Sequence, residues 1–261
     1  MITSTQNLKI KKINQLLSKS KIRKKERLFI VEGKKIIDEI NCSRIWEIYI
    51  SNTFLEKHES YVNKLYKSNI QVEIVSDNVM KHISSSVTPQ GIIGLIKIVD
   101  TQVSTIINNN PFIIMLENIQ DPGNLGTIIR TADAVKASGI ILSKGSVDVF
   151  NPKVVRATMG SIFRVPIIQD RNLIDDISKL RKNNVEILAS HLKGSTNIYN
   201  CDLTRGICVL IGNEGNGLTE QIANLADKNI KIPMIGESES LNAGVATSII
   251  AYESLRQRNY K

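Results

Sequence analysis

Two glycine-rich segments near the C-terminus constrain the fold of this chain more than any other feature. Residues 212–217 read Gly-Asn-Glu-Gly-Asn-Gly and follow an apolar run, and residues 236–242 read Gly-Glu-Ser-Glu-Ser-Leu-Asn and follow another. Glycine lets the main chain approach a ligand closely. Dinucleotide-binding folds place such a loop after their first strand. The two late loops therefore predict a ligand pocket that is built near the end of the chain.

A regular alternation of apolar runs and helix-like stretches surrounds these loops. The runs lie at 112–116, 139–142, 185–189, 207–211 and 229–234. Strands that alternate with helices predict a parallel sheet. We expect one further helix over 218–226 and a last helix from about Leu241 to Arg256, capped by Ser240 or Asn242.

The first hundred residues have a different pattern and are expected to form a separate unit. Five apolar residues near the start recur at helical spacing between lysines, which predicts an amphipathic helix. Apolar runs at 28–31, 45–50, 72–75 and 91–96 are typical of strands, with helices around 33–40 and 53–68. The predicted domains are residues 1–100, a linker over 101–111 and a second domain over 112–261.

The positive charge of the chain is confined to its beginning. Residues 1–35 hold eleven Lys or Arg residues and two acidic ones, and the rest of the chain holds 23 of each, so the whole net charge of +9 lies there. Such a local excess favours a polyanionic partner, although a solvated basic helix face has the same composition. The candidate nucleic-acid-binding residues of this segment are Lys9, Lys11, Lys12, Lys19, Lys21, Arg23, Lys24 and Lys25. The stretch 151–166 adds Lys153, Arg156 and Arg164.

Composition also bears on whether the protein is membrane-bound, secreted, disulfide-bonded or metal-binding. No apolar stretch is long enough to cross a membrane, and the first residues lack the apolar core of a signal peptide, so we expect a cytoplasmic protein without a membrane partner. Three cysteines without C-x-x-C spacing and three scattered histidines indicate neither a disulfide framework nor a metal site.

A polar loop also follows the apolar run 112–116. Pro122 and Gly123 force a turn, and Asn124 is expected to cap a helix that begins at Leu125. Arg130 lies among the apolar residues of this helix and is placed to point at the strand ends, where open α/β sheets bind ligands. A surface ion pair is the alternative role for Arg130.

Taken together, three blocks resemble the motifs of the SpoU family of S-adenosylmethionine-dependent RNA 2′-O-ribose methyltransferases. The blocks are Asp-Pro-x-Asn-x-Gly-x-x-x-Arg-Thr-Ala at 121–132, Gly-x-Glu-x-x-Gly-Leu at 212–218, and Ile-Pro-Met-x-Gly at 232–236 leading to Ser-Leu-Asn at 240–242. The resemblance spans most of residues 111–258. Residues 29–33 (Phe-Ile-Val-Glu-Gly) and 88–92 (Thr-Pro-Gln-Gly-Ile) also resemble the substrate-binding domain of many members.

The resemblance implies an α/β protein in which a trefoil-knotted, SPOUT-type parallel-sheet methyltransferase domain follows a small N-terminal α/β RNA-binding domain. It further implies S-adenosylmethionine as cofactor, an RNA partner and a homodimer. By motif position, the cofactor contacts are Gly212, Ile232, Met234 and Leu241. The positions associated with catalysis are Asn124, Arg130, Glu214, Ser240 and Asn242.

A guanidinium holds its proton firmly, so we expect Arg130 to act as an electrostatic clamp rather than as a base, with Asn124 and Ser240 orienting the ribose. Whether Glu214 and Ser240 act in the chemistry or hold the loops in shape stays open at this point. A separate N-terminal domain favours ribosomal RNA, and 23S rRNA in particular, as substrate. The alternatives are a transfer-RNA 2′-O-methyltransferase and a non-catalytic RNA-binding protein.

Overall fold

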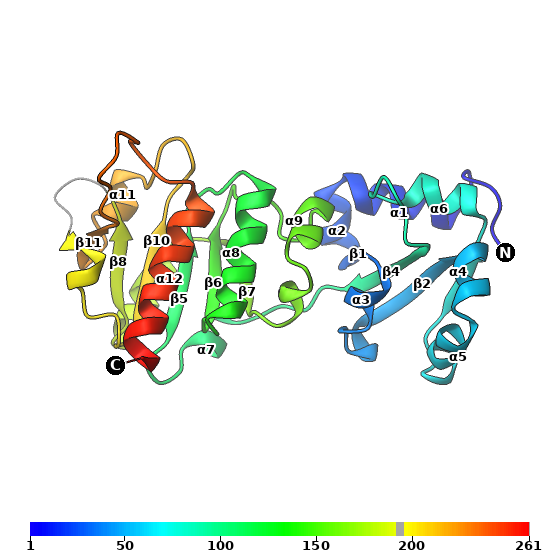
Figure 1. Ribbon diagram of the computed structural model, residues 1–261, viewed down its shortest axis with the longest axis horizontal. Helices are drawn as coiled ribbons and strands as arrows, with labels where there is room; N and C mark the ends of the chain where they lie inside the picture. The colour runs from blue at the N-terminus through cyan, green and yellow to red at the C-terminus, as the bar shows by residue number, and fades with distance from the viewer. Residues whose placement is uncertain (192–195, 261) are drawn as a thin grey trace. The chain divides into compact units, whose positions relative to one another are not determined.

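A parallel sheet runs through the second half of the chain (Figure 1). The structure is a computed structural model that describes residues 1–191 and 196–260. The strands are β5 (Phe112–Leu116), β6 (Gly139–Ser143), β7 (Ile167–Arg171), β8 (Glu186–Ser190), β9 (Thr196–Asn197), β10 (Ile207–Ile211) and β11 (Lys228–Lys231). They lie in the order β7-β6-β5-β10-β8-β11-β9, and every neighbouring pair is parallel. The parallel sheet predicted from the sequence is confirmed.

The central strands of this sheet are buried along their whole length. Every residue of β5, β6 and β10 is buried, as expected of strands covered by helices on both faces. The covering helices are α7 (Val103–Ile106), α8 (Pro122–Ala134), α10 (Leu173–Lys182), α11 (Glu220–Ala223) and α12 (Ala243–Asn259), with 3-10 turns η2 (Ser161–Phe163) and η3 (Ile198–Asn200). The expected helix over 218–226 is wrong in length, because α11 keeps a single turn.

The last helix lies against α8. A Cβ atom on Gly244 would stand 3.2 Å from Thr127 of α8, so the two helices approach closely at this point. One turn further on, the hydroxyls of Thr131 and Ser248 hydrogen-bond at 2.8 Å. Asn242, and not Ser240, caps α12 by accepting hydrogen bonds from the main-chain N–H groups of residues 244 and 245.

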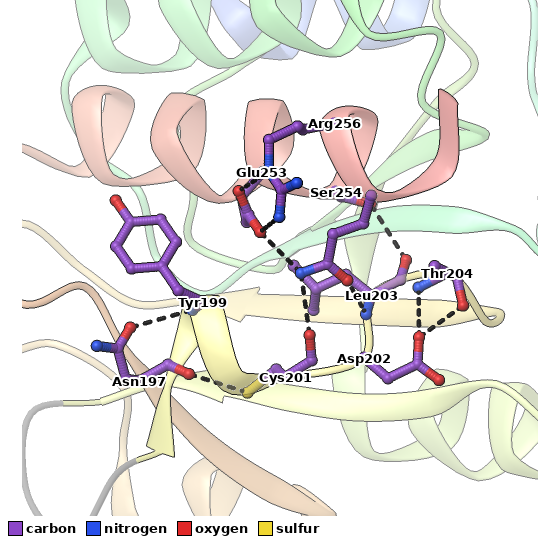
Figure 2. Close-up of polar contacts among 10 residues, drawn as sticks. Asn197, Tyr199, Cys201, Asp202, Leu203, Thr204, Glu253, Ser254 and Arg256 are labelled. Atoms are coloured by element: carbon purple, nitrogen blue, oxygen red, sulfur yellow. Dashed lines mark hydrogen bonds and ion pairs between the residues drawn. The ribbon is translucent and has the colours of Figure 1, made fainter. Parts of the chain in front are cut away.

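The C-terminal end of α12 is hydrogen-bonded to the segment that follows β9 (Figure 2). Gln257 donates to the main-chain oxygen of Cys201 at 3.0 Å and accepts from the main-chain nitrogen of Leu203 at 2.8 Å. Glu253 accepts from Gln257 at 2.8 Å and forms an ion pair with Arg256. The helix is therefore held at both ends, which fixes its first turn beside the late loops.

The first unit contains a four-stranded mixed sheet. Its strands are β1 (Leu28–Glu32), β2 (Ile45–Ser51), β3 (Val72–Val75) and β4 (Ile92–Lys97), in the order β1-β4-β2-β3, with only β2 and β3 parallel among the described strands. Its helices are α1 (Leu8–Ser18), α2 (Ser20–Glu26), α3 (Lys34–Ile37), α4 (Asn52–Lys57), α5 (Glu59–Lys67) and α6 (Asp77–Ile83), with the 3-10 turn η1 (Cys42–Arg44). The helix α1 buries Ile10, Ile13 and Leu16, which confirms the predicted amphipathic helix.

The chain divides into two compact units that do not follow sequence order throughout. One unit holds Met1–Val99 together with Phe150–Gly160, which includes α9 (Pro152–Ala157), and the other holds Asp100–Val149 and Ser161–Lys261. Part of the predicted linker forms the helix α7. Val103 and Ile106 of this helix pack into the core of the second unit. Over the described ranges, no helix combines the length and the apolar composition that a membrane crossing requires.

Candidate active site

A cavity of about 380 Å³ opens where the late loops of the second unit meet. Its walls come from the carboxyl end of β8 and from residues in the ranges 211–218, 230–234 and 240–246. Six of the nine residues assigned to cofactor binding or catalysis line it, namely Gly212, Glu214, Ile232, Met234, Ser240 and Leu241. The three motifs are thus brought together, and two of them form the cavity wall directly.

The loop after β10 is closed by its own main chain. Asn213 and Gly217 exchange two hydrogen bonds of 3.0 and 2.9 Å, and Gly217 has a positive φ of 69°. A Cβ atom on Gly212 would stand 2.1 Å from the main chain of residues 217 and 218. Only glycine fits position 212, because any side chain would force the loop open.

The segment between β11 and α12 offers its main chain to a ligand. Within the described residues, the main-chain N–H and C=O groups of residues 232–241 form no hydrogen bond. Ile232, Met234 and Leu241 are nevertheless half-buried on the cavity wall. No protein group among the described residues competes for these donors and acceptors. This segment can therefore hydrogen-bond a bound molecule such as a nucleoside.

Glu214 ties the loop after β10 to the loop before α8. Its carboxylate accepts from the main-chain nitrogens of Gln120 and Asp121 at 3.2 and 3.1 Å and from the side chain of Asn124 at 3.0 Å. Partial burial by itself would raise the pKa of Glu214, but these hydrogen bonds outweigh it and lower the pKa below its usual range. A carboxylate with a lowered pKa and this many donors is a weak base and an effective tether.

Asn124 continues this chain of contacts to the last helix. Its side-chain oxygen accepts a hydrogen bond of 2.7 Å from Asn242, whose own oxygen caps α12. Each amide is therefore oriented by its partners. The prediction from the sequence that Asn124 caps α8 is wrong. The helix begins at Pro122, and Asp121 caps it by accepting a hydrogen bond of 2.8 Å from the main-chain nitrogen of residue 124.

Arg130 and Ser240 remain available for a substrate. Arg130 lies exposed on α8, and neither its side chain nor that of Ser240 has a hydrogen-bond or ion-pair partner among residues 1–191 and 196–260. The surface ion pair considered for Arg130 is not present there. The same residues contain no group of three or more His, Cys, Asp or Glu side chains that could hold a metal ion.

The predicted RNA-binding cations fall into two groups. Four are engaged within the protein: Lys9 with Glu47 and Glu73, Lys12 with Glu26, Arg23 with the main-chain oxygen of Leu16, and Arg164 with Asp133. Arg23 is only 3% exposed, so it does not lie on the surface. The exposed group is Lys11, Lys19, Lys21, Lys24, Lys25, Lys153 and Arg156, of which Arg156 donates to the main-chain oxygen of Ser85 and Lys24 also interacts within the protein.

Sequence reasoning missed the part of the cavity contributed by β8. Ser190 and His191 line the wall at the carboxyl end of this strand. The apolar run 185–189 was identified, and ligands of open α/β sheets bind beyond the carboxyl ends of strands. The two residues after the run could have been placed by that rule.

Comparisons with known proteins agree on both parts of the chain. Residues 111–252 match the model of the SpoU rRNA Methylase family, and residues 7–94 match the MRM3-like substrate binding domain. The 23S rRNA (guanosine(2553)-2′-O)-methyltransferase RlmP of Bacillus subtilis is 30% identical over 96% of this chain and 97% of its own.

Solved structures give the same result. An AdoMet-bound rRNA methyltransferase from Sinorhizobium meliloti superposes with a TM-score of 0.89 and 34% identity, covering 100% of this chain and 98% of its own. A TrmH/SpoU tRNA modifying enzyme from A. aeolicus covers 60% of this chain and 80% of its own, with 30% identity and a TM-score of 0.52. The similarity to the rRNA enzymes therefore extends over both units.

Proposed function

Since this chain belongs to the SpoU rRNA methylase family, we propose that it transfers a methyl group from S-adenosylmethionine to a ribose 2′-hydroxyl of 23S ribosomal RNA. The observation that carries the proposal is the cavity, whose wall is formed by two of the motifs and to which hydrogen bonds of Asn124 connect the third. The substrate is inferred from the relatives that match both units, since the B. subtilis 23S rRNA enzyme spans 96% of the chain and the A. aeolicus tRNA enzyme only 60%.

The residues of the cavity fit the cofactor. Its volume of about 380 Å³ lies within the range of small-molecule sites. The main chain of residues 232–241 supplies hydrogen-bonding groups, and Leu218 and Ile230 supply apolar surface. When bound, the cofactor supplies a methyl carbon made electrophilic by its sulfonium sulfur. Gly212, Ile232, Met234 and Leu241 would hold it.

We assign the substrate side of the site to Arg130 and Ser240, the two predicted residues without a partner among the described residues. The Arg130 guanidinium would bind a neighbouring phosphate and stabilise negative charge on the ribose oxygen as its proton passes to solvent. Ser240 would orient the ribose. Asn124, Glu214 and Asn242 are positioning residues, because their polar atoms are used to hold the three loops together.

The chain's path supports a trefoil knot and a homodimer as further parts of the proposal. The segment 232–242 passes from the cavity wall into α12, which packs on α8, and such a crossing suits a knotted pocket. On α12, the apolar residue Val245 and Tyr252, one heptad apart, are 46% and 54% exposed. We propose that this face meets a second copy, and that the enzyme works in the cytoplasm. Analytical ultracentrifugation of Tyr252→Glu, against the wild type, tests the dimer.

Mapping of 2′-O-methylated nucleotides in total RNA from cells with and without the gene tests the main proposal. We expect one position of 23S rRNA to lose its methyl group, and purified protein with S-adenosylmethionine to restore it. Loss of a methyl group from a transfer RNA alone would move the substrate to tRNA. No change in any RNA, together with no cofactor binding by calorimetry, would identify a non-catalytic RNA-binding protein.

A further inference from the structure

The single tryptophan of the chain stands on an irregularity in the first sheet. The pairing of β2 with β4 shifts register between Ile45 and Glu47, so Trp46 is the extra residue of a bulge. Bulges re-aim side chains away from the regular face. The other six residues of β2 are buried, whereas Trp46 is 55% exposed. A large aromatic ring is therefore presented to solvent by a rigid element.

A lysine from the neighbouring strand holds this ring. The Lys97 ammonium lies 5.7 Å from the centre of the Trp46 ring, within the range of a cation–π contact. The same ammonium donates to the main-chain oxygen of Ser43 at 3.1 Å. Lys97 is thus fixed from two sides and sets the orientation of the indole.

Two arginines add positive charge at the end of β4. Arg27 donates to the main-chain oxygen of Ile98 at 3.2 Å, and Arg44 donates to that of Lys97 at 3.5 Å. Arg27 directly follows α2, whose last turn carries exposed Lys24 and Lys25. Lys97 therefore lies beside the ring, and Arg27 and Arg44 hydrogen-bond the end of the strand that carries Lys97.

We propose that Trp46 is a stacking platform for an unpaired RNA base, with Arg27, Arg44 and Lys97 engaging the adjoining phosphates. The inference rests on the RNA substrate proposed above and identifies a site outside the methyl-transfer cavity. An exposed aromatic ring near cations is a usual arrangement for binding single-stranded nucleic acid, because every base has a face to stack and every nucleotide carries a negative charge. Bases inside a duplex are already stacked and cannot use the ring.

Trp46 reports on this site directly, because it is the only tryptophan. Full-length protein is titrated with a single-stranded RNA oligonucleotide, with its duplex form and with poly-glutamate, while indole fluorescence and fluorescence anisotropy are recorded. Saturable quenching by the single strand, and weaker quenching by the duplex, is expected. Equal quenching by poly-glutamate, or RNA binding that leaves the fluorescence unchanged, overturns the proposal.

Variants separate stacking from folding. Trp46→Ala should weaken single-strand affinity roughly tenfold, as expected for loss of one base–aromatic stack, and Trp46→Phe should restore most of it. Tyr66→Ala is the matched control, since Tyr66 is another aromatic residue of this unit that is 48% exposed. If Trp46→Ala binds the single strand as tightly as the wild type, the stacking platform is overturned. The proposed function stands in that case, provided that cofactor binding and 23S methylation persist. Failure of the wild type to bind any RNA overturns both proposals.

Discussion

Arg130 is the residue whose chemistry is most sharply tested by substitution. Its guanidinium has no partner among the described residues and does not line the cavity wall, so its removal should leave the cofactor site intact. We expect Arg130→Ala to lower kcat by at least about a hundredfold, a loss typical for removal of one charge-stabilising donor. Cofactor affinity by calorimetry should stay within about twofold.

The control for Arg130 is Arg130→Lys, which keeps the charge but loses the planar fork. Intermediate activity of this variant supports a clamp that depends on geometry. Methyl transfer by the Ala variant at a near wild-type rate would remove Arg130 from the substrate site.

Glu214 permits the opposite test, because it is assigned to holding loops. Glu214→Gln replaces one acceptor oxygen with an NH₂ group, and because Gln120 and Asp121 donate to different oxygens of Glu214, one of these two contacts is lost. We expect cofactor affinity to fall about tenfold, measured by calorimetry. Unchanged affinity combined with lost turnover would place Glu214 in the chemistry instead.

At the scale of elements, the loop after β10 depends on the absence of a side chain at one position. Gly212→Ala would push a methyl group against the main chain of Gly217, which cannot move without breaking the hydrogen bonds that close the loop. We expect cofactor binding to become undetectable by calorimetry. Gly236→Ala is the matched control, because nothing lies within 4 Å of its Cβ position. Equal affinity of the two variants would contradict the role given to the closed loop.

A buried carboxylate near the junction of β7 and α10 makes the stability of the fold depend on pH. Asp176 is fully buried and paired with Arg171 and Lys179. Burial by itself would raise the pKa of Asp176, but the hydrogen bonds from the two cations outweigh it and lower the pKa below the ordinary 3.8. Because the folded pKa lies below the unfolded one, the carboxylate stabilises the fold above about pH 4. This contribution is lost as pH falls through the folded pKa.

Asp176→Asn should therefore lower the free energy of unfolding at pH 7 by about 2 kcal/mol, measured by urea denaturation, because the buried carboxylate loses its charge-assisted hydrogen bonds with two partly exposed cations. The difference from the wild type should shrink below pH 4. Asp175→Asn changes the exposed neighbouring carboxylate and should have little effect. A constant difference between Asp176→Asn and the wild type from pH 7 to pH 3 would contradict the assignment.

Elements with a strong apolar pattern were predictable from the sequence, and those shaped by tertiary contacts were not. The buried strands β5, β6 and β10 followed from continuous apolar runs. The strand β7, Ile-Ile-Gln-Asp-Arg, was missed because it is a half-exposed edge strand with two apolar residues. The length of α11 was overestimated from the sequence. The apolar residues Leu225 and Ala226 pack on the core but do not continue the helix.

The candidate site also has features that were predictable from the sequence and contacts that were not. The motifs predict Gly212, Ile232 and Leu241 as cofactor contacts, and all three line one cavity. The link from Glu214 through Asn124 to Asn242 joins residues 90 and 118 positions apart, and neither periodicity nor local spacing carries that information. Charge counting likewise identified the basic segment but could not tell buried Arg23 from exposed Lys21.

At the scale of the whole molecule, we expect the two units to bind different ligands. The excess positive charge lies in the first 35 residues, within the first unit, and the cavity belongs to the second. Substrate affinity and cofactor affinity should therefore respond to different variants. Phosphate contacts would give RNA binding a steep salt dependence, whereas the main-chain groups proposed to hold the cofactor carry no net charge.

Salt dependence of RNA binding tests which lysines of the basic segment meet phosphate. Lys19 and Lys21 are exposed and have no ion-pair partner among the described residues, so each is free to displace a counterion from RNA. The double variant Lys19→Gln, Lys21→Gln should bind 23S fragments more weakly and reduce the slope of log affinity against log salt by about two, one for each charge. Fluorescence anisotropy between about 50 and 300 mM salt measures this slope.

Lys9→Gln serves as the matched control, because Lys9 already pairs with Glu47 and Glu73 and its pKa is raised by these partners against the effect of burial. Its loss should lower the melting temperature and leave the slope unchanged. A reduced slope for Lys9→Gln with no change for the double variant would mean that the surface turned toward RNA is the face of α1 next to β2. A slope near zero for the wild type would remove the basic segment from the interface altogether.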